Sequence, residues 1–192
     1  MRTLATIVFI VLIGCAAGLA SAYRAIETGF IADAVSTPSW RGWLGAGDVD
    51  ADPYTRAAAA SLRDLTMASG QGLTLFADAD STGAPLEGRC TYRVRGRTPA
   101  AQWWTLSVYD RDGHRPMANP TDRYGFTSSE IVRRSDGSFE IVIAPEVQPG
   151  NYLPSDASAR LTLILRLYEK PVALAGDIDP ATLPSILRED CP

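Results

Sequence analysis

The chain begins with one uninterrupted apolar run. Residues 3–22 contain no charged side chain. A helix of this length spans roughly 30 Å, which is the hydrocarbon thickness of a bilayer. No second run of this kind occurs in the 192 residues. We therefore predict one membrane-anchoring helix, within residues 1–34, and expect the lipid bilayer to be its partner.

Three fates fit this segment. We favour an uncleaved anchor, because Tyr23, Ile26 and Phe30 continue the apolar pattern at helical spacing. The small residues that end at Ala22 have the form of a signal peptidase site, so cleavage there would give a secreted protein. The residues that end at Cys15 have the form of a bacterial lipobox, so lipidation there would give a lipoprotein.

The flanking charge sets the expected orientation. Arg2 precedes the apolar run and favours an N-terminus in the cytoplasm. All three fates leave the rest of the chain on the other side. We therefore expect a single-pass protein of the inner (cytoplasmic) membrane with its C-terminal domain in the periplasm.

The pattern then passes through a linker and a helix. We expect residues 35–51, with several glycines, to be a linker whose Trp40 and Trp43 lie either in the headgroup region or against the domain. Asp52 and Pro53 are an N-cap and a first helical residue, and the apolar positions that follow predict a helix to about Ser69.

From Leu73 the apolar period changes to two, which is typical of strands. Alternation predicts strands at residues 73–77, 90–94, 103–109 and 161–168, and a hairpin in which 131–132 and 139–143 flank a Ser-Asp-Gly turn. We expect residues 179–192 to be a loop with one short helical turn. The pattern predicts a mainly β domain over residues 52–192, a β-sandwich or jelly roll.

Composition and charge argue against two classes of function, nucleic-acid binding and metal binding by several histidines. Hydrophobic residues make up 46% of the chain and the net charge is −4, so nucleic acid is disfavoured as a partner. Arg93, Arg95 and Arg97 alternate with small or apolar residues, which we interpret as one solvated face of a strand. A single histidine excludes metal sites that need two or three histidine ligands.

The cysteines suggest one disulfide. Cys15 lies in the apolar run, which leaves Cys90 and Cys191 as one pair in the extracytoplasmic part. An oxidising compartment favours their disulfide, and two free thiols are the alternative.

Candidate acids, bases and metal ligands are sparse. Asp110, Asp112 and His114 are close enough in sequence for acid–base chemistry, but no nucleophile stands at a recognisable offset, so we favour a solvated hairpin turn. The alternating aspartates at 48–52 and 78–80 do not complete an EF-hand pattern. We expect no metal and no cofactor.

Aromatic residues offer a candidate ligand site. Tyr92, Trp103, Arg166 and Tyr168 would line a cleft if the sheets brought them together, since small-molecule sites are rich in aromatic groups with a few polar ones. Packing in the core or on a sheet face is the alternative.

Five blocks of sequence resemble the DUF1214 domain in its short, stand-alone, membrane-anchored bacterial members. They are 88–96, 102–110, 119–124, 151–154 and 163–168, preceded by a similar motif at 52–57. The resemblance covers roughly residues 50–190, with Tyr152 in place of an expected tryptophan. It implies a jelly-roll-like fold and carries over no catalytic residue, because the family's function is unknown.

The leading hypothesis is a non-catalytic accessory or structural module of the bacterial envelope, with other envelope proteins as partners. A domain that binds a small molecule or a glycan is the first alternative, and a hydrolase-like enzyme is the second.

Overall fold

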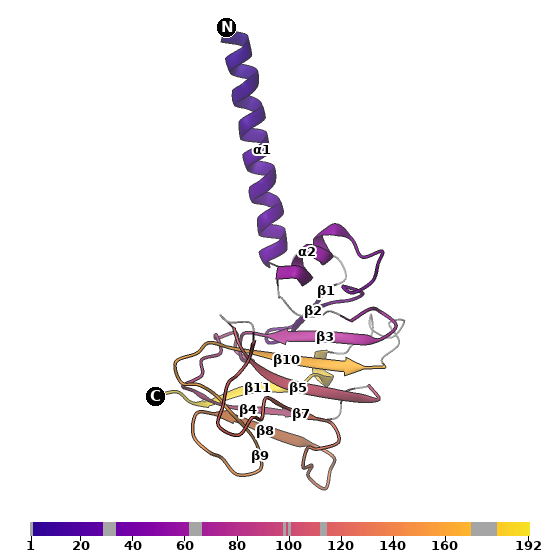
Figure 1. The fold of residues 1–192 in the computed structure, drawn as a ribbon, viewed down its shortest axis with the longest axis vertical. Coiled ribbons are helices and arrows are strands. Elements are labelled where there is room, and N and C mark those ends of the chain that lie inside the picture. Colours follow the sequence, from indigo (N-terminus) through magenta and orange to yellow (C-terminus); the bar gives the residue numbers. More distant parts are fainter. Residues whose placement is uncertain are drawn as a thin grey trace.

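The computed structural model describes residues 2–28, 34–61, 67–97, 99, 101–111, 115–169 and 180–192. A long helix, α1 (Arg2–Thr28), precedes a short helix, α2 (Pro53–Ser61), and strands in two sheets (Figure 1). A 3-10 turn, η2 (Pro180–Thr182), lies near the C-terminus. The mainly β fold class predicted from the pattern is confirmed.

Within the described ranges the strands form a larger and a smaller sheet. The larger sheet consists of β1 (Ala34–Ser36), β2 (Arg41–Trp43), β3 (Gly72–Ala77), β10 (Leu161–Tyr168), β5 (Trp103–Asp110) and β6 (Arg115–Pro116) in this order, with β7 (Gly125–Thr127) also paired to β5. The smaller sheet has the order β11 (Ser185–Asp190), β4 (Thr91–Gly96), β8 (Phe139–Ala144) and β9 (Asn151–Pro154). Of these pairs, only β8 with β9 is parallel.

The core lies between the two sheets. The leucines at alternate positions of β10 are buried and face it, and Leu165 lies between Leu75 and Leu106 in the neighbouring strands. Trp104 from the larger sheet meets Phe139 from the smaller sheet, with ring centroids 4.8 Å apart. The two-residue alternation therefore sorts each strand into a core face and an outer face.

Helix α2 covers the other face of the larger sheet. Ala58 and Ala59 pack with Trp43 against Phe76 and Ile164, which point away from the main core. The small alanine side chains let the helix lie close to the strands. This explains why β3 is buried on both faces, a pattern that alternation alone did not predict.

The stretch 35–51, expected to be a linker, contains β1 and β2. Trp40 is 2% exposed, and its indole Nε1 donates a hydrogen bond of 2.6 Å to the carbonyl oxygen of Pro184. Trp43 is buried beneath α2. Of the two placements expected for these tryptophans, the structure has the one against the domain.

The helix predicted to run to about Ser69 is shorter. Its described part is Pro53–Ser61, residues 62–66 lie outside the described ranges, and Met67 and Ala68 are not helical. Here the backbone bonds to the preceding loop instead, since Gly47 N donates to Met67 O at 3.2 Å and Ser69 N donates to Asp48 at 2.8 Å. A tertiary contact thus overrides a favourable helical pattern.

The predicted hairpin around residues 131–143 is only half formed. Its turn is present, with Gly137 at φ 79°, but its first arm is not a strand apart from a bridge between Arg133 and Phe139. The side chain of Asn151 takes the place of a pairing strand: it accepts from Val132 N and donates to Val132 O, both at 2.8 Å.

The C-terminal tail was predicted to be a loop with a helical turn. The turn is η2, but residues 185–190 form β11, which pairs with β4. Cys191, directly after this strand, forms a disulfide with the fully buried Cys90. The tail is therefore a covalently fixed edge of the smaller sheet.

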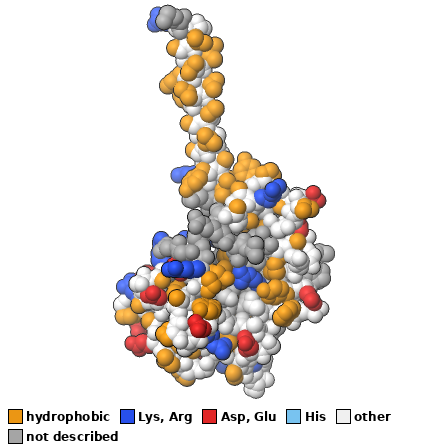
Figure 2. Space-filling view, in the orientation of Figure 1, with side chains coloured by type: hydrophobic (Ala, Val, Ile, Leu, Met, Phe, Trp, Pro, Cys, Tyr) orange, Lys and Arg blue, Asp and Glu red, His pale blue; other side chains and the backbone are white. Residues whose placement is uncertain are grey.

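Helix α1 extends away from the sheets (Figures 1 and 2). Residues Arg2–Ile26 form a helix that is long and apolar enough to cross a membrane. Its most apolar stretch is not buried against the domain. Its last part reaches the domain, where Ile26 packs on the cluster beneath α2. An anchor and a signal sequence both fit this helix.

Candidate functional site

Three of the four predicted ligand residues share the outer face of the larger sheet. Trp103 on β5 lies opposite Tyr168 on β10, and their ring centroids are 5.2 Å apart. Arg166 lies two residues before Tyr168 on the same face, and its guanidinium carbon is 6.0 Å from the ring centre of Tyr109. Trp103 remains 50% exposed. The sheet register thus brings the exposed Trp103 and the half-buried Tyr168 together near a cation.

Tyr92 does not join them. Its side chain is 1% exposed in the core between the sheets, where its hydroxyl accepts a hydrogen bond from Glu87 N at 2.8 Å. Burial raises the pKa of the Tyr92 hydroxyl. Strand β4 turns odd and even positions to opposite faces, so Tyr92 is a core residue in this fold.

Of the three acid–base candidates, the structure describes only Asp110. Asp110 ends β5, and one carboxylate oxygen is 3.6 Å from Nε of Arg115. Asp112 and His114 lie outside the described residues. Their role in catalysis therefore stays a prediction.

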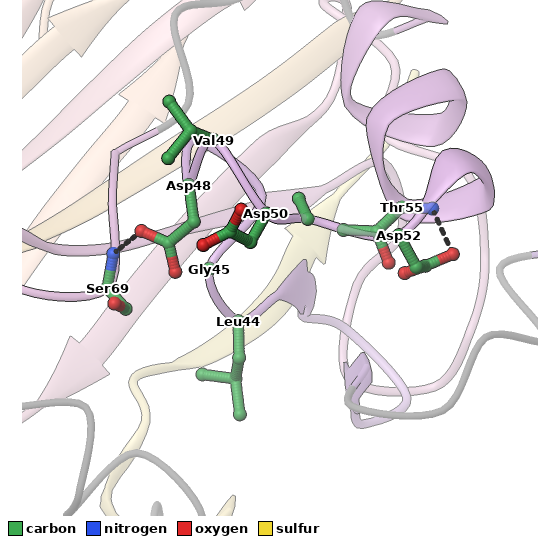
Figure 3. Close-up of a pocket in the computed structure, with 9 residues that line it drawn as sticks. Leu44, Gly45, Asp48, Val49, Asp50, Asp52, Thr55 and Ser69 are labelled. Atoms are coloured by element: carbon green, nitrogen blue, oxygen red, sulfur yellow. Dashed lines mark hydrogen bonds between the residues drawn. The ribbon is translucent and has the colours of Figure 1, made fainter.

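A hollow of about 540 Å³ lies between the loop before α2 and the turn at Ser69. Asp48, Asp50 and Asp52 line it (Figure 3). Figure 3 shows Asp48 turned toward Ser69 and Asp52 toward Thr55. Asp52 accepts from the backbone N–H groups of Tyr54 and Thr55 at 2.9 and 3.2 Å, and hydrogen bonding to Thr55 lowers the pKa of Asp52. Asp48 and Asp52 thus act as loop and helix caps.

Two carboxylates that the sequence pattern offered only as calcium ligands hold strands together: Asp78 is partly buried and Asp80 is buried. Asp78 accepts a hydrogen bond of 2.5 Å from Thr162 Oγ1 and pairs with Arg41. Asp80 is 2% exposed and lies 3.2 Å from Nε of Arg188. Burial opposes the charge on Asp80, but hydrogen bonds from Thr82 and Ala84 and the charge of Arg188 together lower its pKa.

A third carboxylate, Glu140, lies on the outer face of the smaller sheet. It contacts Arg93 Nη1 at 2.6 Å, Arg95 Nε at 2.5 Å and Arg134 Nη2 at 3.2 Å. Burial would raise the pKa of Glu140, but the hydrogen bonds from Arg95 and Arg93 lower it. The alternation of Arg93 and Arg95 correctly indicated an outward face, but the shared carboxylate 45 residues away had no local signal.

Comparison with solved structures finds one chain with a similar fold and a second, weaker match. The VPA0106 protein of Vibrio parahaemolyticus has a crystal structure that matches 73% of this chain with a TM-score of 0.60 and 21% identity. The match covers 36% of that protein, so the chain spans about a third of its length. An uncharacterised protein of Burkholderia cenocepacia matches 92% of this chain and 50% of its own, with a TM-score of 0.41 and 19% identity.

The curated proteins contain no significant match to this chain. A family model does match: it is described as a protein of unknown function, DUF1214, and it aligns with residues 71–172. The match covers more than half of the chain and includes β3, β10 and β5 at the centre of the larger sheet. The chain therefore belongs to the DUF1214 family.

Proposed function

We propose that the chain is a membrane-tethered module whose DUF1214 domain works in the periplasm in an accessory or structural role, without catalysing a reaction. The observation that carries this proposal is the exposed apolar helix α1, which ends in contact with the domain. Leu19, for example, is 74% exposed, and an apolar surface of this size is unfavourable in water.

Two further observations support this placement. The disulfide between Cys90 and Cys191 fits an oxidising compartment. Helix α1 also continues without a break past Ala22 to Thr28, as an uncleaved anchor would. The described acidic residues Asp78, Asp80 and Glu140 are occupied by structural contacts, which favours an accessory role.

Thiol labelling in spheroplasts tests the placement. The variant Val147→Cys puts a reactive group at a position that is 85% exposed, in a chain that also carries Cys15→Ser. We expect a membrane-impermeant maleimide to label it in intact spheroplasts. The matched control is Thr3→Cys in the same background, which keeps the charge of Arg2 and should react only after lysis. Labelling of the Val147→Cys chain only after lysis would contradict a periplasmic domain.

The unsubstituted chain, prepared in the same way with Cys15 intact, decides between the three fates of α1. An anchored chain resists carbonate extraction and keeps its N-terminus. A mature N-terminus at Tyr23 would instead show cleavage, and an acyl chain on Cys15 found by mass spectrometry would show a lipoprotein.

A second candidate function is binding of a small molecule or glycan, which the Trp103–Tyr168 pair favours. Sugar rings pack on exposed aromatic faces, and Arg166 would supply hydrogen-bond donors for sugar hydroxyls or a carboxylate. Titration of the full chain with an N-acetylglucosamine tetramer and a galacturonate tetramer, followed at the backbone amide resonance of Tyr168, tests it. We expect Trp103→Ala to abolish the shift and Tyr124→Ala to leave it unchanged. No shift with either sugar would count against glycan binding.

A further inference from the structure

The outer face of the smaller sheet carries three arginines around one carboxylate. Arg93 and Arg95 project from β4, and Glu140 lies opposite Arg95 on β8. Arg134 approaches from the turn before β8. We call Arg93, Arg95, Arg134 and Glu140 the arginine cluster. Arg95 and Arg134 contact the same oxygen, Oε2 of Glu140, at 2.5 and 3.2 Å, so their guanidinium groups lie next to each other.

The cluster has more positive than negative charge. Glu140 neutralises one of the three arginines, and Glu189, 2.5 Å from Nε of Arg93, neutralises another. One positive charge is left over, although the whole chain has a net charge of −4. An anion at this place would balance the local charge.

The arginines also have unused donors. A guanidinium has five N–H donors in a planar fork, which suits bidentate binding of an oxyanion. Among the residues that the structure describes, Arg95 contacts Glu140 through Nε alone and Arg134 does so through Nη2 alone. Their side chains are 44% and 59% exposed, so the remaining donors are open to a ligand from solution.

A hollow of about 170 Å³ adjoins the cluster. Its apolar wall is formed by Val132, Val142 and Pro149, and its polar wall includes Arg134, Glu140 and Asn151. Asn151 is held in place, since its amide nitrogen donates to Val132 O and Glu140 O at 2.8 and 2.9 Å. A water molecule takes about 30 Å³, so the hollow has room for one short side chain rather than a large ligand.

The location excludes the nearest lipid headgroups as the natural occupant. Strands β8 and β9 lie at the end of the domain away from α1 (Figure 1). If α1 crosses the bilayer, this face points into the compartment that holds the domain. A ligand must then come from solution or from another protein.

We propose that this surface binds a carboxylate that carries a short branched apolar group. The carboxylate bridges the guanidinium groups of Arg95 and Arg134, and the apolar group packs against Val132, Val142 and Pro149 in the hollow. A polypeptide C-terminus that ends in a residue such as valine has this chemistry, and so does a free branched acid. The inference does not depend on the role proposed for the domain above.

N-acetylvaline is the probe that combines both features. We would titrate it into the 15N-labelled full chain in non-ionic detergent and follow the backbone amides of Gly150 and Asn151. We expect a saturable shift, with at least about tenfold weaker binding of N-acetylvalinamide, which lacks the charge, and of acetate, which lacks the apolar group. A pentapeptide that ends in valine separates the sources: tighter binding than N-acetylvaline points to a protein C-terminus, and weaker binding points to a free acid.

Variants and a competing anion make the test decisive. Arg134→Gln should weaken N-acetylvaline binding about tenfold, the loss expected for a charge-assisted hydrogen bond, while the exposed control Arg123→Gln should bind as the unchanged chain does. The proposal is overturned if N-acetylvaline gives no saturable shift, if N-acetylvalinamide or inorganic phosphate binds equally well, or if Arg134→Gln binds normally in a chain whose other resonances are unchanged.

Discussion

Trp40 Nε1 and the carbonyl oxygen of Pro184 form a buried hydrogen bond of 2.6 Å across 144 residues of sequence. It joins the segment after α1 to the segment before β11, so both ends of the domain close over the same core. Trp40 also belongs to the main apolar cluster. This contact therefore integrates the N-terminal stretch into the fold.

Trp40→Phe should lower the free energy of unfolding by about 1–3 kcal/mol, because it leaves the Pro184 carbonyl without its donor and removes part of a buried ring. Trp40→Ala should cost about 3–5 kcal/mol. Urea unfolding of the full chain in detergent measures both. Trp103→Ala is the matched control, since Trp103 is 50% exposed, and an equal loss there would contradict the difference in packing.

The disulfide should contribute strongly to stability. It joins residues 101 positions apart, and closure of a loop of about 100 residues is worth up to about 4–5 kcal/mol in the loop-entropy model. We expect Cys191→Ser to lower the melting temperature and to remove its sensitivity to reducing agent. Cys15→Ser should change neither property. A melting temperature that does not respond to reduction in the unchanged chain would show that the bond is not formed.

Glu140 should make stability depend on pH. Its folded-state pKa is lower than the ordinary glutamate value of 4.5, so the unfolded chain binds more protons in this range. The stabilisation is complete above about pH 5 to 6 and is lost as the pH falls through 4.5 toward the lower folded-state pKa. Urea unfolding between pH 3 and 7 should show a shallower slope for Glu140→Gln. Glu146→Gln, at an exposed position, should keep the slope of the unchanged chain.

Gly42 is required by the close approach of β2 to β3. A Cβ atom there would lie 2.6 Å from the carbonyl oxygen of Thr74, which belongs to the backbone and has little freedom to move. Gly42→Ala should therefore destabilise the domain by about 1–3 kcal/mol. Gly70→Ala is the control, because nothing lies within 4 Å of its Cβ position. Similar melting temperatures for the two variants would be evidence against this packing.

Some of the candidate site could be predicted and some could not. The two-residue period of β5 and β10 was enough to put Trp103, Arg166 and Tyr168 on one side of their strands. It could not show that Tyr92, which lies on a strand of the smaller sheet, points into the core between the sheets. That placement depends on how the two sheets pack. The ion pairs of Asp78, Asp80 and Glu140 were missed, since their partners come from distant parts of the chain.

The apolar helix, the positions of most strands and the family could all be inferred from the amino-acid sequence, because each rests on a local pattern or on blocks that occur in order. Three features came from the folded structure: the helical pattern is broken at Met67 and Ala68, β11 forms, and Arg95, Arg134 and Glu140 meet beside a hollow. These features depend on contacts between residues far apart in the chain, such as Trp40 with Pro184. The free energy of these long-range contacts exceeds the local conformational preferences of the segments involved, so a local sequence pattern cannot predict them.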